Sequence, residues 1–179
     1  MYKKMYGLAI NFLGLVAASL TAGATTITLT AVATGGILTV ARNGKKATLS
    51  TGAKAYAAYK GDGTADSAAH TLVATATAGQ AALMVIGLLN VSGTETLVAI
   101  VGDAVDLDAA GVIEQPGGIP FPVVGDLIVP VAYATIKNPA ASGTATFTFG
   151  TTNWNATDIA TDIVDCATLP DRPLTSLSI

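Results

Sequence analysis

The strongest constraint on the fold is an alternating stretch over residues 119–154. It holds two runs, 127–138 and 144–149, in which β-branched or aromatic side chains recur at every second position. Period-two spacing is typical of strands, because successive side chains point to opposite faces of a sheet. Pro139 and Gly143 mark a turn between the runs. We therefore predict a β-hairpin with a five-residue connection.

The alternation also predicts which side chains share a face of this hairpin. One face of the first run carries its larger β-branched and aromatic side chains: Val129, Val131, Tyr133 and Thr135. The opposite face takes the positions between them: Ile128, Pro130, Ala132, Ala134 and Ile136. In the second run Phe147 and Phe149 share a face, and Trp154 follows. Because aromatic residues are only 6% of the chain, we expect the core to form here.

Two further hairpins are predicted upstream. Asn43-Gly44 separates two short strands, and this dipeptide suits the positive φ angles of a type I′ turn. Residues 80–89 form a nearly continuous apolar run, typical of a strand buried on both faces, and the chain returns over 94–101. Together with a half-buried strand at 24–32, these patterns predict a mainly β fold, a β-sandwich or barrel-like single domain.

The two ends of the chain are apolar and are assigned separately from this domain. Residues 1–20 have the pattern of a secretory signal, since two lysines precede an apolar run, and an uncleaved signal is one alternative. The run is too short and too interrupted to span a bilayer. We expect instead an N-terminal arm or short helix over 1–20, a β domain over 21–169 and a C-terminal tail over 170–179. Residues 155–167 fit either a helix or a strand.

Charged residues make up only 12% of the chain, about half the share usual in soluble domains. A free monomer normally presents a charged surface, so we expect this one to be covered by copies of itself or by a larger assembly. A surface of Thr, Ser and Gly is the alternative. The net charge of −3, with no basic stripe, argues against nucleic acid as a partner.

Nothing in the sequence predicts catalysis. The single histidine, His70, lies at a polar loop edge where a solvated side chain is expected, and Cys166, the single cysteine, excludes an internal disulfide. No nucleophile, phosphate-loop or His-rich metal motif occurs. Two acidic groups match a calcium loop only in part, and Asp is equally a turn residue. These groups are Asp62 with Asp66, and Asp103 with Asp106 and Asp108. We predict no enzyme activity, no metal and no cofactor.

Six segments, taken in order, carry a resemblance to a group of uncharacterised bacteriophage virion proteins. These segments are Thr21–Thr30, Asn43–Lys45, Gly118–Pro122, Val131–Lys137, Phe147–Thr157 and Leu169–Pro173. The resemblance spans roughly residues 20–173 as a pattern, and its clearest part is Phe-Thr-Phe-Gly-Thr-Thr-Asn-Trp, which begins at Phe147. The N-terminal arm takes no part in it.

The resemblance implies a structural component of the phage particle, a capsid decoration (cement) protein on the capsid surface. Such a protein would bind the major capsid protein as a dimer or trimer and stabilise the shell by repeated contacts, with no membrane involved. Two alternatives stay open. One is a tail or receptor-binding virion module with exposed aromatics such as Tyr56, Tyr59 and Trp154. The other is a secreted bacterial surface or pilus-like protein.

The apolar ends are the predicted assembly contacts. We expect six side chains to be buried against neighbouring copies: Leu8, Ile10, Phe12, Leu13, Leu174 and Leu177. The reason is that apolar termini on a charge-poor chain are exposed unless a neighbour covers them.

Overall fold

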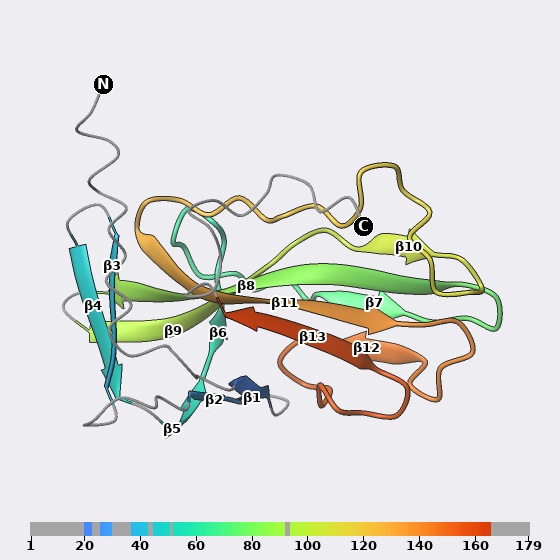
Figure 1. The fold of residues 1–179 in the computed structure, drawn as a ribbon, viewed down its shortest axis with the longest axis horizontal. Coiled ribbons are helices and arrows are strands. Elements are labelled where there is room, and N and C mark those ends of the chain that lie inside the picture. Colours follow the sequence, from blue (N-terminus) through green and yellow to red (C-terminus); the bar gives the residue numbers. More distant parts are fainter. Residues whose placement is uncertain are drawn as a thin grey trace.

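The computed structural model describes residues 20–22, 26–29, 37–42, 45–50, 52–91 and 94–165, with side chains over 56–89 and 96–163. Within these ranges every regular element is a strand (Figure 1), which confirms the predicted mainly β class. The first seven strands are β1 Leu20–Ala22, β2 Thr26–Leu29, β3 Ile37–Arg42, β4 Lys45–Ser50, β5 Gly52–Ala55, β6 Ala57–Ala58 and β7 Thr71–Val73. The others are β8 Gly79–Val91, β9 Thr94–Val101, β10 Val105–Leu107, β11 Ile128–Asn138, β12 Thr146–Thr148 and β13 Ala160–Asp165.

Six strands form the main sheet, which is not closed into a barrel within the described residues. β13, β11, β8, β9 and β6 lie side by side in that order, and β10 pairs with the beginning of β8. All these neighbours are antiparallel except β6, which runs parallel to β9. Figure 1 shows the long strands along the long axis of the molecule, with the β3–β4 hairpin across one end. Arg42 pairs with Lys45 in that hairpin, which confirms the predicted two-residue connection.

β8 is the centre of the main sheet and is buried on both faces, as the sequence predicted. One hydrophobic core, here called the first core, takes its even-numbered side chains: Ala82, Met84, Ile86 and Leu88. The second core, on the other face, takes odd-numbered ones: Leu83, Val85 and Leu89. Each fully buried large apolar side chain contributes about 2 kcal/mol to folding, so this strand is a main source of stability.

A β-bulge at Val131 changes the facing of β11 part-way along the strand. The pairing of β11 with β8 shifts between Pro130 and Ala132, so Val131 has no partner on β8. A bulge suits this place because proline cannot donate a hydrogen bond to the ladder, and its extra residue reverses the alternation. Val131 and Ala132 both face the first core, whereas Tyr133 lies in the second core with Ile128. The predicted facing, which put Val131 and Tyr133 together, is wrong beyond the bulge.

The predicted hairpin between 127–138 and 144–149 does not form. β11 pairs with β8 on one edge and with β13 on the other, so neither edge is left for β12. β12 pairs instead with β7, where Phe147 lies opposite Leu72. Both side chains are fully buried in the first core, and Phe149 packs against it as predicted. The β7–β12 pair is therefore a second layer over one face of the main sheet.

Asn138, at the end of β11, ties this second layer to the main sheet. Its side chain is completely buried, and Nδ2 donates to the carbonyl oxygen of Leu72 at 2.9 Å and to that of Thr144 at 3.0 Å. Leu72 belongs to β7 and Thr144 precedes β12, so one amide holds both strands of the layer. Oδ1 of Asn138 has no hydrogen-bond partner among the described residues.

Residues 155–167, which fitted either a helix or a strand, form a strand over part of their length. β13 occupies 160–165 and pairs with β11, Ile163 opposite Ala134. The preceding residues form turns. No helix long and apolar enough for a membrane crossing is found in the part of the chain that the structure describes.

Candidate functional site

The six predicted assembly contacts lie outside the described residues, and so does Cys166. Leu8, Ile10, Phe12, Leu13, Leu174 and Leu177 therefore stay predictions. Two features of the described chain qualify as candidate sites: a hollow beside His70 and an exposed apolar segment before β11.

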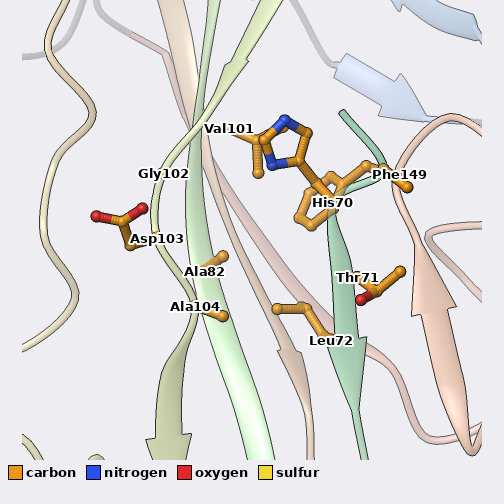
Figure 2. A pocket seen from close by; sticks show the side chains of 10 residues that line it. His70, Thr71, Leu72, Ala82, Val101, Gly102, Asp103, Ala104 and Phe149 are labelled. Atoms are coloured by element: carbon orange, nitrogen blue, oxygen red, sulfur yellow. The ribbon is translucent and has the colours of Figure 1, made fainter. Parts of the chain in front are cut away.

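The hollow lies where the partner strand of β8 is interrupted between β9 and β10. Met84 pairs with Val101 and Ala81 with Val105, so three residues, 102–104, stand opposite two on β8. This irregularity leaves a space of about 220 Å³. Figure 2 shows the His70 ring between Val101 and Phe149, among the residues that line this space.

His70 is held by its neighbours, so the prediction of a solvated side chain is wrong. Its Nε2 lies 2.9 Å from Oδ2 of Asp66, and the side chain is 26% exposed. The backbone carbonyl of His70 also accepts a hydrogen bond from the Phe149 N–H at 3.0 Å. The Asp103 carboxylate points away from the imidazole in Figure 2. The hollow is therefore lined by one imidazole, small side chains and an aromatic ring. The contact between His70 and Asp66 stabilises the loop that connects them.

Asp66 gives this loop a testable dependence on pH. Hydrogen bonds from the Ala68 N–H and from the His70 ring lower the pKa of Asp66 below its usual 3.8. Because the folded-state pKa is the lower one, the ionised carboxylate stabilises the fold above pH 3.8, and this contribution is lost as the pH falls through the folded-state pKa. Asp66→Asn should flatten the pH dependence of the unfolding free energy between about pH 2 and 5, measured by urea denaturation.

The control for this measurement is Asp103→Asn, because the Asp103 carboxylate is exposed and makes no hydrogen bond within the described chain. Asp103→Asn should show the same decrease in unfolding free energy at acidic pH as the wild-type protein. An Asp66→Asn profile that coincides with the wild-type profile would show that the pair with His70 does not stabilise the fold.

Three of the aspartates weighed for calcium, Asp62, Asp66 and Asp108, accept hydrogen bonds from backbone N–H groups of their own turns. Oδ1 of Asp62 accepts hydrogen bonds from the hydroxyl of Thr64 at 2.7 Å and from its N–H at 2.9 Å, and these lower the pKa of Asp62. Oδ1 of Asp108 accepts two backbone N–H groups of the next turn, each at 2.8 Å. Asp106 accepts from the Gln80 amide at 3.1 Å. Over the described residues, no three acidic, imidazole or thiol groups converge as metal ligands would.

The aromatics that a receptor-binding module would expose are largely internal. Trp154 is 3% exposed, and Tyr56 meets it edge-on with ring centres 6.2 Å apart. Burial raises the pKa of Tyr56, whose hydroxyl accepts a hydrogen bond from the Gly150 N–H at 3.2 Å. Tyr59 packs against the second core. Tyr56 and Tyr59 are thus only partly exposed, and Trp154 is buried.

The segment before β11 presents an exposed apolar surface, here called the apolar ridge and defined as residues 119–127. Its sequence is Ile-Pro-Phe-Pro-Val-Val-Gly-Asp-Leu, with one charge. Ile119, Phe121 and Val124 pack against the second core, and the Phe121 ring lies 5.4 Å from that of Tyr133. Every residue of the ridge keeps some exposure, and Val123 is 85% exposed. The ridge is thus held by contacts with the second core on one side and exposed to solvent on the other.

The apolar ridge is clasped to the loop over 60–66, here called the tip. The Gly125 N–H donates to the carbonyl oxygen of Gly61 at 2.8 Å. A Cβ on Gly61 would collide with the carbonyl oxygen of Val123, so only glycine allows this approach. The tip is closed in turn by the bonds of Asp62 and by a backbone bond from Lys60 to Thr64 at 2.8 Å. The tip therefore lies on the surface as a loop whose turns are closed by hydrogen bonds.

Gly61→Ala should open this clasp. The added methyl group has no space beside Val123, so the two loops must separate and the Gly125 N–H loses its acceptor. We expect the Gly125 amide to exchange with solvent about tenfold faster or more, measured by NMR hydrogen exchange. Ser67→Ala, an exposed change in the same loop, should leave that rate unchanged. Equal rates in Gly61→Ala and the wild type would refute the clasp.

In the sequence, Gly118–Pro122 served only as a segment of the resemblance, and residues 119–127 were not predicted as a contact site. A signal was present, since Ile-Pro-Phe-Pro-Val-Val is an uncharged apolar run outside any predicted strand. Proline makes such a run a poor strand, so its side chains cannot all be buried by sheet packing. An apolar run of this kind is a candidate contact surface.

In comparisons with known proteins, no family model, curated protein or solved structure matches the chain.

Proposed function

We propose that the protein is a non-enzymatic structural component of a bacteriophage particle, a cement or decoration protein that binds the outer capsid. The observation that carries the proposal is the apolar ridge, which stands exposed on a chain with only 12% charged residues. Exposed apolar surface of this kind marks a contact with another protein chain, whether a further copy of this one or a subunit of the shell. The resemblance of the sequence to phage virion proteins directs the proposal to a particle.

The fold suits a protein that works by contact area. The main sheet and its second layer give a stiff platform, and the apolar ridge and the tip are fixed on it by the second core and the clasp. A rigid surface loses little conformational entropy when it binds. Each buried contact contributes about 25 cal/mol per Å² of apolar area, and the symmetry of a shell repeats it at every site.

Antibody labelling of purified particles tests this proposal. An antibody is raised against the full chain and applied to density-banded virions from the source of the gene, which are viewed by electron microscopy. We expect dense labelling of the capsid surface. Quantitative mass spectrometry of the same particles should find the chain at a fixed ratio to the major capsid protein, as a repeated shell contact requires.

The same experiment separates the alternatives. Label confined to the tail would establish a tail or receptor-binding module. Label on the host cell envelope, with none on particles, would establish a secreted surface or pilus-like protein. Either result would overturn the cement assignment.

A further inference from the structure

We propose that the apolar ridge, residues 119–127, together with the tip, residues 60–66, is a self-association surface on which two copies of the chain pack about a two-fold axis. The inference rests on the proposed function, since a decoration protein is expected to act as a dimer or trimer, and it places the contact between copies on the folded domain. The chain ends, which the sequence favoured, are the competing location.

The first support is that this surface is apolar and preorganised. Val123 is 85% exposed and Leu127 is 53% exposed, and both belong to the same clasped unit. The Leu127 methyl group lies 3.4 Å from the Cβ position of Gly63, so the tip and the ridge lie against each other. The backbone that carries these side chains is fixed by Gly61 and Gly125. A partner can therefore bury them without first ordering a loop.

The second support is the arrangement of charge around the apolar residues. Lys60 and Asp62 are both exposed on the tip, and Asp126 is exposed on the ridge. In a two-fold contact the same patch serves both copies, so Lys60 of each copy can pair with an acidic residue of the other. A rim of a single sign would repel a second copy, whereas this mixed rim is complementary to itself. A second copy is thus the occupant that the patch favours.

The size of the surface sets the expected strength. A standard interface buries about 800 Å² and about 20–30 residues per partner, and the nine residues of the ridge with the seven of the tip fall below that number. We expect a dimer with a dissociation constant on the order of 1–100 μM, which a particle with many adjacent copies would strengthen by repetition.

Sedimentation velocity of the full chain, over about 1–300 μM, tests the inference. The variants are Val123→Asp and Leu127→Asp, which place a charge in the centre of the proposed contact. The matched control is Val112→Asp, because Val112 is 60% exposed on a different loop. We expect the wild type and the control to dimerise alike and both ridge variants to bind at least about tenfold more weakly. Circular dichroism checks that all variants keep the fold.

A disulfide trap gives a second, independent readout. In a Cys166→Ala background, Val123→Cys should form a covalent dimer under mild oxidation, because the two-fold axis brings the two positions together. Val112→Cys in the same background should stay monomeric. Equal trapping at both positions would count against a specific contact.

The outcomes separate this inference from the proposed function. If the oligomer persists in Val123→Asp but dissociates when residues 1–19 are removed, the contact does not lie on the ridge. Self-association itself would then still be supported. A wild type that is monomeric throughout overturns self-association as a whole, and the particle labelling then decides the virion assignment by itself. The wild type could also be monomeric while Val123→Asp lowers its stability and Val112→Asp does not. That result would show that the ridge is buried by another part of the same chain, and it would also overturn the inference.

Discussion

Asn138→Asp should lower the free energy of unfolding by about 4 kcal/mol. The Asn138 side chain is fully buried, and its amide is the donor to the carbonyl oxygens of Leu72 and Thr144. A carboxylate has no hydrogen to donate, so both buried acceptors lose their partner. The substitution also places an ionisable group among apolar side chains. The loss is measured by urea denaturation at neutral pH.

Two further variants separate the causes of this loss. Asn138→Leu removes the donors without adding a charge, so it should cost about 2 kcal/mol. Asn153→Asp makes the same chemical change at an exposed position and should lie within about 0.5 kcal/mol of the wild type. A cost below about 1 kcal/mol for Asn138→Asp would mean that the second layer does not depend on this amide.

Phe147→Ala should destabilise the protein by about 4 kcal/mol, because it removes a buried ring and leaves a cavity between the two layers. Phe147 is completely buried in the first core, and the Phe149 ring meets it edge-on at 5.1 Å. The main sheet presents small residues to this core, Ala82, Ala99, Ala132 and Ala134 among them. Alanines cannot move into the space, so the cavity should remain. Thermal and urea denaturation give the difference.

Phe149→Ala is the matched control, since the same ring is removed from a residue that is only partly buried. It should cost about half as much or less, because solvent already reaches one side of that ring. Equal losses for the two phenylalanines would contradict the assignment of Phe147 as the centre of the layer contact.

Much of the strand content was predictable from the sequence, because alternation and apolar runs report local geometry. The doubly buried strand over 80–89 and the connection at 43–44 are confirmed for this reason. Partners were not predictable in the same way. Two adjacent alternating runs suggested a hairpin, yet β11 is paired on both edges by β8 and β13. A period-two pattern indicates that a segment is a strand, but it does not indicate which other strands pair with it.

The bulge and the candidate site show a second limit of the sequence. Pro130 stands beside the bulge, but a proline alone does not fix where the extra residue falls, so the change of facing at Tyr133 could not be foreseen. The clasp depends on Gly61 meeting Gly125 from a distant part of the chain, and His70 meets Asp66 only through the shape of its loop. Such approaches are decided by tertiary packing.

The two pairing partners of β8 become available at different times during synthesis of the chain, so the strands of the main sheet pair in a fixed order. β8 can meet β9 as soon as the hairpin between them emerges, but its other edge waits for β11, whose Ala134 pairs with Met84. The second layer waits longer still, because β7 precedes β8 and its partner β12 follows β11. Pairings so distant in sequence slow folding. During that delay β8, the most apolar of the described strands, has an open edge, so a newly made chain is most prone to aggregation before synthesis reaches β11.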